Sequence, residues 1–209
     1  MNLERVKIKM CGMTREQDAG FAVSLGVDAI GLIFYPRSRR YVTIAQAKSI
    51  VREIPPFVSI VAVVVNPTAE DLTNILNEVP VQWIQFHGDE SPEFCSQFNR
   101  PYIKSVAASS TDVINQSMKL YDGASAILLD TPSVQRGGVG KAFDWQVIPE
   151  KRSKPIILAG GLDASTVKRA VSLTMPHGVD VCSGIEVSPG IKDHSRMFDF
   201  VNALRGDDE

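Results

Sequence analysis

A cysteine near the start of the chain has neighbours that suit a reactive thiol. Cys11 follows the stretch 6–10, in which apolar and charged residues alternate with the period of two that is typical of a β-strand. The thiol could act as a nucleophile or as a base, although a single cysteine is most often a small buried side chain. A nucleophile normally needs a histidine partner, and neither His177 nor His194 follows a strand-like run. The pattern therefore favours a base.

A carboxylate ends another strand-like run. Asp130 follows the wholly apolar residues 126–129. Burial there would raise the pKa of the carboxyl group, which could then act as a general acid at neutral pH. Alternatively, the carboxylate accepts a hydrogen bond in the next loop, through Thr131. The glycine-rich residues 137–140 that follow are typical of a lid over a substrate, or of a merely flexible connection.

Two glycine-containing loops predict a phosphate site. Gly160 and Gly161 precede a helical pattern, and Ser183 and Gly184 precede a second short element. Glycines let backbone N–H groups approach an anion closely, and helix N-termini favour negative charge. The alternative is that the glycines only make tight turns and that Asp163 only caps a helix.

Basic and imidazole side chains follow two further runs. Arg37, Arg39 and Arg40 lie in one loop, and a guanidinium group suits a carboxylate or a phosphate, although at least two of the three should simply be solvated. His87 is interpreted as a hydrogen-bonded structural histidine rather than a catalyst. No second histidine or carboxylate stands at a ligand-like spacing, so no metal site is predicted.

Eight strand-like runs precede or contain these residues, about 20 to 30 residues apart, with helical apolar stripes between them. The runs are 6–10, 28–34, 58–65, 81–86, 102–106, 124–130, 155–159 and 178–182. Eight such units favour a single-domain (β/α)8 barrel over residues 1–209, with its chemistry at the carboxyl ends of the strands. An open doubly wound sheet is the alternative, but it would normally carry a glycine-rich dinucleotide fingerprint after the first strand, which residues 11–14 lack.

Two local expectations concern the helices. Thr14 and Gln17 have the spacing of a capping box, and the unit after Phe143 has the weakest helical pattern. Residues 205–209 are expected to form a disordered acidic tail.

Composition limits the partners and the compartment. The 22 basic and 24 acidic side chains nearly balance, which argues against nucleic acid or an anionic membrane as a partner. No apolar run approaches the length of a membrane span. The three scattered cysteines indicate a reducing compartment, the cytoplasm, and no disulfide framework.

Taken in order, these motifs resemble phosphoribosylanthranilate isomerase of tryptophan biosynthesis over essentially the whole chain. The matching segments are 9–14, 34–41, 81–88, 128–131, 137–145 and 180–186. Two positions depart from the family pattern, which usually has isoleucine at Met10 and serine at Cys182. The second departure puts another thiol near the presumed phosphate loop.

The resemblance implies a (β/α)8 TIM barrel with no metal and no organic cofactor. It implies the Amadori rearrangement of N-(5′-phosphoribosyl)anthranilate to its 1-deoxyribulose 5-phosphate derivative. By motif, Cys11 would be the general base and Asp130 the general acid. Arg40, through the anthranilate carboxylate, and His87 would bind this small phosphorylated substrate. The chain is expected to be a monomer or a homodimer.

The expected chemistry agrees with these residue types. An acid must protonate the furanose oxygen to open the ring, and a base must then remove the proton from C2 of the resulting Schiff base. A free cysteine with a pKa near 8.5 is only a few per cent ionised at pH 7, so we expect the surroundings of Cys11, such as nearby helix-terminus N–H groups, to activate it. The sister Amadori isomerase of histidine biosynthesis is a poorer match, because it has aspartate at the position of Cys11. A catalytically dead sugar-phosphate sensor is disfavoured by the presence of both Cys11 and Asp130.

Overall fold

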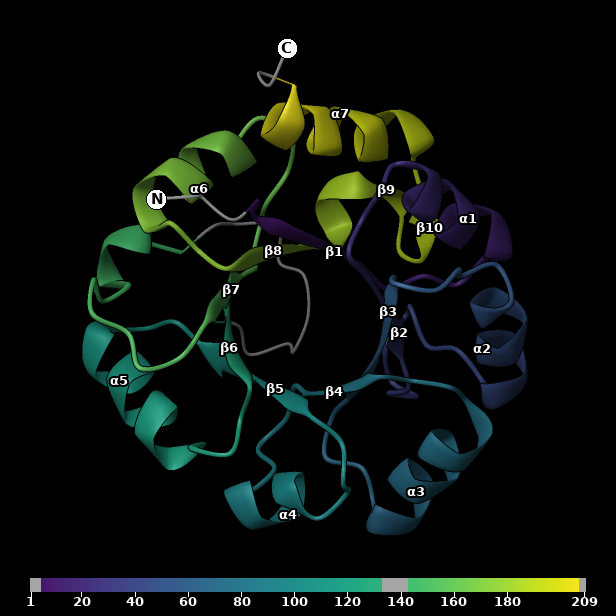
Figure 1. Ribbon diagram of the computed structural model, residues 1–209, viewed down its shortest axis with the longest axis horizontal. Coiled ribbons are helices and arrows are strands. Elements are labelled where there is room, and N and C mark those ends of the chain that lie inside the picture. Colours follow the sequence, from purple (N-terminus) through teal and green to yellow (C-terminus); the bar gives the residue numbers. More distant parts are fainter. Residues whose placement is uncertain (1–4, 133–142, 207–209) are drawn as a thin grey trace.

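The computed structural model describes residues 5–132 and 143–206, so the predicted lid at 137–140 lies outside the described part of the chain. Eight strands form a closed ring, and helices surround it (Figure 1). The ring strands are β1 Lys7–Cys11, β2 Ala29–Ile33, β3 Ser59–Val64, β4 Trp83–Phe86, β5 Tyr102–Ala107, β6 Ala126–Asp130, β7 Ile156–Leu158 and β8 Gly178–Val181. The helices are α1 Glu16–Ser24, α2 Ile44–Val51, α3 Ala69–Glu78, α4 Pro92–Ser96, α5 Thr111–Leu120, α6 Val167–Thr174 and α7 His194–Arg205.

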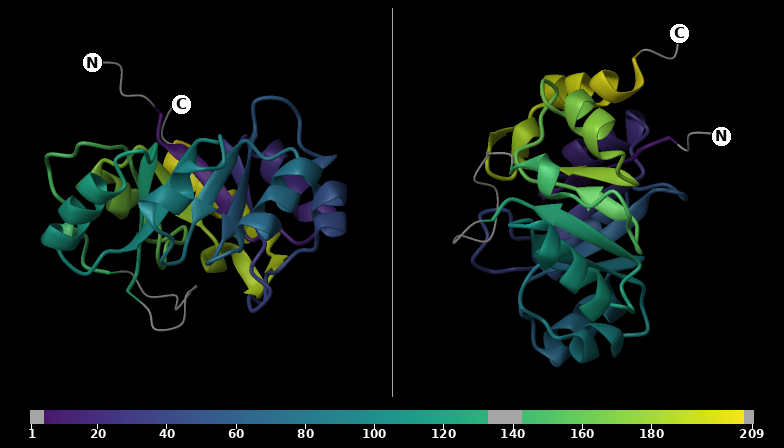
Figure 2. Two further views of the ribbon diagram at one scale, coloured as in Figure 1. Left: turned by 90° about the horizontal axis from the view of Figure 1, so that it is seen from below. Right: turned by 90° about the vertical axis from the view of Figure 1, so that its left-hand side faces the viewer.

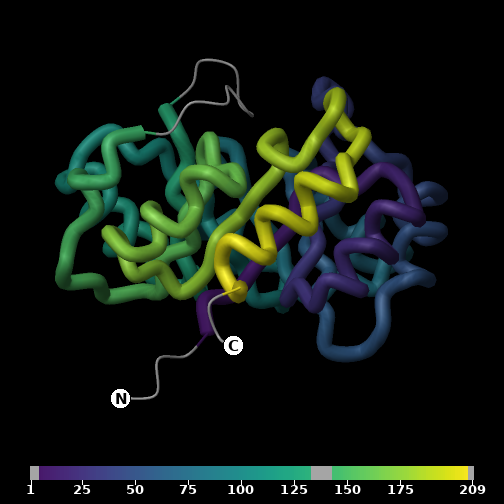
Figure 3. Tube along the Cα trace, turned by 90° about the horizontal axis from the view of Figure 1, so that it is seen from above, coloured from purple at the N-terminus to yellow at the C-terminus, as the bar shows by residue number. Residues whose placement is uncertain are grey.

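The ring strands are all parallel and follow one another in chain order, and β1 pairs with β8 to close the barrel. This topology confirms the predicted single-domain (β/α)8 barrel and excludes the open sheet. The helices form an outer layer in both side views (Figure 2). Helix α7 lies between α6 and α1 and covers the seam between β8 and β1 (Figure 3).

Strand residues alternate between the barrel interior and the layer beneath the helices. In β1, Ile8 and Met10 pack in the large core between strands and helices, whereas Cys11 packs inside the barrel against Val61. Lys9 shares the inward face with Cys11, because residues two apart in a strand point to the same side. Strand β1 thus presents a cation and a thiol to the barrel interior.

The capping box predicted at Thr14 is wrong. Helix α1 has Arg15 at its N-cap and no side-chain cap there. The Thr14 hydroxyl instead donates to the carbonyl of Gly190, between the short strands β9 Glu186–Ser188 and β10 Ile191–Lys192. The hydroxyl therefore ties the hairpin that follows β8 to the loop that follows β1. The weakest predicted helical unit is a single 3-10 turn, Trp145–Val147.

The first residue of the predicted tail, Arg205, belongs to helix α7. Arg205 ends α7 and donates to the carbonyls of Leu25 and Gly26, at 3.0 and 2.8 Å. The rest of that tail, 207–209, lies outside the described residues. Within the described residues, no helix combines the length and the apolar character needed to cross a membrane.

Candidate active site

A cavity of about 490 Å³ lies at the carboxyl ends of the barrel strands. Its size is in the usual range for small-molecule sites, roughly 300–1,000 Å³. Cys11 at the end of β1 and Asp130 at the end of β6 both line it, although β1 and β6 are not neighbours in the barrel. The predicted site residues that line this cavity are Cys11, Arg40, His87, Asp130, Gly160, Gly161 and Ser183.

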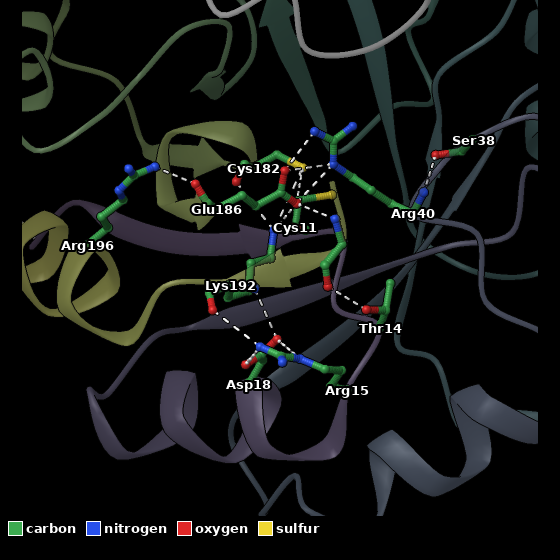
Figure 4. A network of polar contacts seen from close by, with 11 residues as sticks. Cys11, Thr14, Arg15, Asp18, Ser38, Arg40, Cys182, Glu186, Lys192 and Arg196 are labelled. Atoms are coloured by element: carbon green, nitrogen blue, oxygen red, sulfur yellow. Dashed lines mark hydrogen bonds and ion pairs between the residues drawn. The ribbon is translucent and has the colours of Figure 1, made fainter. Parts of the chain in front are cut away.

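A second thiol lies directly beside Cys11. Strands β1 and β8 pair with Met10 opposite Val181, which places Cys11 opposite Cys182 one residue further along. Both thiols line the cavity, and they hydrogen-bond to each other. The two sulfur atoms are adjacent in Figure 4. The site therefore holds a thiol pair rather than a single thiol.

Two cations stand next to this thiol pair (Figure 4). Lys192, whose side chain is wholly buried, donates to the carbonyl oxygens of Cys11 and Cys182, and its Nζ lies 3.9 Å from the Sγ of Cys182. Arg40 approaches from the loop between β2 and α2. The hydrogen bond with Cys11, together with the charges of Lys192 and Arg40, outweighs burial and lowers the pKa of Cys182 to about 7.

The lowered pKa expected for Cys11 is not found at Cys11 itself. The hydrogen bond with Cys182 and complete burial raise the pKa of Cys11 well above its usual value, and the charge of Lys9 offsets only part of this. The positive charges that lower the thiol pKa values belong to side chains, and their effect is stronger at Cys182. The pair accordingly loses one proton near neutral pH and retains the second.

A buried ion pair supports the thiols from inside the barrel. Lys9 and Asp180 face each other across the seam of β1 and β8, with Nζ 2.8 Å from Oδ1 and little of either side chain exposed. Burial would lower the pKa of Lys9, but Asp180 and Cys11 raise it. Burial also raises the pKa of Asp180, which Lys9 offsets in part. Removing either partner would leave the other charge buried without compensation.

Arg40 is held in place before any ligand arrives. Its Nε lies 2.9 Å from Oε1 of Glu186, and its Nη2 lies 2.7 Å from Oε2. Burial would raise the pKa of Glu186, but Arg40 and Lys192 lower it. Among the described residues, Nη1 of Arg40 has no protein acceptor, so one edge of the guanidinium group remains for an anion. Arg37 and Arg39 are exposed, as predicted for two of the three arginines.

Asp130 is less buried than predicted and is paired with His87. Its side chain retains 23% of its exposed area, and its Oδ1 accepts from the backbone N–H of Thr131 at 2.7 Å. Oδ2 faces Nε2 of His87 at 3.4 Å, while Nε2 of Gln85 lies 3.2 Å from the other ring nitrogen of His87. If Gln85 donates there, the ring proton of His87 lies on Nε2 and points at Asp130. His87 is hydrogen-bonded, as expected, and it also orients the predicted acid.

The two glycine loops meet at the rim of the cavity. Gly160 and Gly161 have φ values of +78° and +67°, a left-handed conformation that favours glycine. Their backbone N–H groups have no acceptor among the described residues, and Ser183 lines the same rim. Gly184 does not line the cavity, because it packs against the carbonyl of Leu162 and so joins the two loops.

Four charged residues of the site were not predicted from the sequence: Lys9, Asp180, Glu186 and Lys192. A signal for Lys9 existed, since it lies two residues before the candidate Cys11 and so shares its inward face; Asp180 stands in the same way two residues before Cys182, which was not a candidate site residue. Lys192 has no such signal, because it lies in the hairpin after β8 and reaches Cys11 across 181 residues of sequence.

The fold and the site define a class of protein. Within the described part of the chain, no group of three His, Cys, Asp or Glu side chains could hold a metal ion. What converges at the mouth of the barrel is a carboxyl group, a thiol pair, a guanidinium group and free backbone N–H groups after β7. This is the arrangement of a barrel enzyme that moves protons on a small anionic molecule.

Comparison with known proteins gives the family. Residues 8–203 match the family model of N-(5′-phosphoribosyl)anthranilate (PRA) isomerase. An N-(5′-phosphoribosyl)anthranilate isomerase of Legionella pneumophila (strain Paris) is 56% identical over 207 residues, which cover 99% of this chain and 100% of that protein. The chain therefore belongs to the N-(5′-phosphoribosyl)anthranilate isomerase family.

Solved structures agree with this assignment. Phosphoribosyl anthranilate isomerase from Thermotoga maritima superimposes with a TM-score of 0.90 at 38% identity, over 96% of this chain and 99% of that chain. A second isomerase structure, in complex with reduced 1-(o-carboxyphenylamino)-1-deoxyribulose 5-phosphate, has a TM-score of 0.83 at 34% identity and the same coverage. A third contains monomers generated from the dimeric Thermotoga maritima enzyme, with a TM-score of 0.82 at 32% identity and coverage of 96% and 99%.

Proposed function

We propose that Cys11 and Asp130 are the general base and the general acid of the reaction that defines this family. The chain is an isomerase of tryptophan biosynthesis that converts N-(5′-phosphoribosyl)anthranilate to 1-(2-carboxyphenylamino)-1-deoxyribulose 5-phosphate. The observation that supports the assignment is that Cys11 and Asp130 line one cavity from two separate strands.

The cavity offers a site for each anionic end of the substrate. Its phosphate would lie against the free N–H groups of Gly160 and Gly161, with Ser183 and Gly184 completing the rim. Its anthranilate carboxylate would meet the unpaired edge of Arg40, as a planar guanidinium group suits a carboxylate. A substrate held at both ends would span the mouth of the barrel, with its sugar between Cys11 and Asp130.

Asp130 would act in the first step. Protonation of the furanose oxygen breaks its bond to C1 and leaves a Schiff base between the sugar and the anthranilate nitrogen. The N–H of Thr131 holds one carboxyl oxygen, so the other oxygen, which faces His87, is the one placed to carry the proton. His87 therefore positions the acid and borders the substrate.

Cys11 would act in the second step by removing the proton from C2. The resulting enol then becomes the ketone of the product. Since the thiol pair holds one proton near neutral pH, that proton can lie on either sulfur, and Cys11 is the base whenever Cys182 carries it. Lys192 favours the negative charge on Cys182, and the charge of Lys9 favours it on Cys11.

The remaining expectations complete this proposal. The proposed reaction needs no metal and no organic cofactor, since both steps are proton transfers. We propose a cytoplasmic enzyme, for which the free thiols of Cys11, Cys95 and Cys182 are suited. We propose a monomer or a homodimer without nucleic acid or membrane as a partner, and sedimentation of the purified chain would decide between the two states.

Turnover of the purified chain tests the assignment. The loss of anthranilate fluorescence should be rapid when freshly made phosphoribosylanthranilate is added. The variants Cys11→Ala and Asp130→Asn should each lose about 10²–10⁴-fold in kcat, the usual contribution of one proton transfer. Cys95→Ala, which changes a buried thiol outside the cavity, is the matched control. Near-normal kcat in either site variant would refute its role.

A further inference from the structure

The thiol pair has the geometry of a disulfide that has not formed. Cys11 and Cys182 each come directly after the last pair of the β1–β8 ladder, Met10 with Val181, and adjacent strands lie about 4.8 Å apart. Disulfides join Cα atoms roughly 4.4–6.8 Å apart, so the backbone need not move far. Both side chains line the cavity at the mouth of the barrel, and their two sulfur atoms are adjacent (Figure 4).

We propose that Cys11 and Cys182 form an oxidative modification site, at which a small peroxide closes an intramolecular disulfide across the seam between β1 and β8. The bond needs a sulfur atom both at Cys11, at the end of β1, and at Cys182, directly after β8. A serine there could not form the bond.

Cys182 is placed to react first. Thiolates react and thiols do not, and the surroundings of Cys182 favour the thiolate: Lys192 lies 3.9 Å from its sulfur, and Arg40 packs nearby. Cys182 is half-buried and lines the open cavity, so a molecule as small as hydrogen peroxide can reach it. Cys95 lies outside this cavity, and burial raises its pKa to about 12.

The reaction balances without any group that the site lacks. The Cys182 thiolate attacks one oxygen of hydrogen peroxide, the O–O bond breaks, and hydroxide leaves and takes up a proton as water. The sulfenic acid formed on Cys182 is then attacked by the sulfur of Cys11. The S–S bond forms, the S–O bond breaks, and a second water leaves with the proton of Cys11. The two sulfurs lose two electrons, and the peroxide gains them.

The bond would remove the base from the site. This consequence, unlike the bond itself, rests on the proposed role of Cys11. A disulfide sulfur cannot accept the C2 proton, so the isomerase would be off while oxidised, and a dithiol reductant such as dithiothreitol would restore it.

The test counts thiols and maps peptides of the purified full chain after treatment with hydrogen peroxide. Under denaturing conditions, treated wild type should show two fewer of its three thiols, and mass spectrometry should find the peptides of Cys11 and Cys182 joined. Cys95→Ala should lose the same two thiols. Cys182→Ser should form no internal disulfide, and a far-ultraviolet circular dichroism spectrum like that of wild type would show that it folds.

The wild-type peptide map decides the proposal without any variant. Both thiols still free, both oxidised singly to sulfinic acid, or either joined to Cys95 or to another chain would each overturn it. Activity is a separate measurement, expected to fall in proportion to the joined fraction and to return with dithiothreitol. A joined pair with full activity would support the modification site and overturn the role of Cys11 as the base.

Discussion

Removal of the charge of Lys192 should shift the pH dependence of the isomerase. The Nζ of Lys192 lies 3.9 Å from the sulfur of Cys182, where two unit charges interact by about 4 kcal/mol at an effective dielectric constant near 20. Glu186, 2.9 Å from the same Nζ, neutralises part of this charge. We therefore expect Lys192→Met to raise the first pKa of the thiol pair by about 1–2 units, at about 1.4 kcal/mol per unit.

The direction of the pH shift follows from the loss of the positive charge of Lys192. A cation favours the thiolate, so its removal means that a higher pH is needed to deprotonate the pair. The acidic limb of kcat/KM, expected near pH 7 because the pKa of Cys182 is about 7, should move to higher pH. At pH 7 the variant should be about 5- to 50-fold slower, since only a small part of its thiol pair would be ionised.

Two measurements separate this effect from general damage to the site. The rate of alkylation by iodoacetamide follows the thiolate directly and needs no turnover, and its pH profile should shift by the same amount. Lys192→Arg should keep the limb near its original pH, because it keeps the charge. Lys48→Met is the matched control, since Lys48 is exposed and pairs with Glu78 far from the site. If Lys192→Met lowered kcat/KM equally at every pH, the electrostatic reasoning would be refuted.

Three further substitutions test other contacts. In Gly31→Ala, the new Cβ would lie 2.6 Å from the sulfur of Cys11. The kcat should therefore fall, and the free energy of unfolding measured in urea should fall by about 1–3 kcal/mol. In Asp180→Asn, the charge of Lys9 would stay buried without its partner, which should cost about 3–5 kcal/mol in the same assay, and adding Lys9→Met should recover much of it. In Gly161→Ala, the left-handed backbone would be strained, and the inhibition constant of inorganic phosphate should rise while kcat with saturating substrate changes little.

One glycine provides a control for two of these changes. A Cβ at Gly20, in helix α1, would meet no atom within 4 Å, and its φ is not among the positive values. Gly20→Ala should therefore leave kcat and the inhibition by phosphate unchanged. If Gly31→Ala left kcat unchanged, the packing of Gly31 against Cys11 would not matter for turnover. If Gly161→Ala left the inhibition by phosphate unchanged, the left-handed conformation of Gly161 would not matter for phosphate binding.

The sequence predicts the barrel well because each strand carries its own signal. Continuous apolar runs such as that of β3 Ser59–Val64 need cover on both faces, which a parallel barrel provides. Cys11, Asp130 and Arg40 line the cavity, as expected for residues at or after the ends of such runs, and their roles stay predictions. Their chemistry was predicted less well: Asp130 keeps more exposure than an apolar run suggests, since β6 ends at the rim of the cavity.

The missed parts of the site depend on contacts between distant segments. Lys9 and Asp180 are 171 residues apart in sequence, and no local pattern reports that their charges meet across the seam between β1 and β8. The failure at Thr14 has the same cause. Its hydroxyl donates to the carbonyl of Gly190, distant in sequence, and α1 has its N-cap at Arg15, one residue later than predicted.

The bond of Lys192 to the carbonyl of Cys11 also bears on how the chain is made. Ribosomes add about 5–20 residues per second, so the 181 residues that separate these two side chains take roughly 10 to 40 s to synthesise. Throughout that interval the nascent chain exposes Cys11 as an ordinary thiol, with neither Cys182 nor Lys192 yet made. The thiol pair, with the lowered pKa at Cys182, exists only once the last strand and its hairpin dock on the first, so the appearance of thiol alkylation at low pH would time the completion of folding.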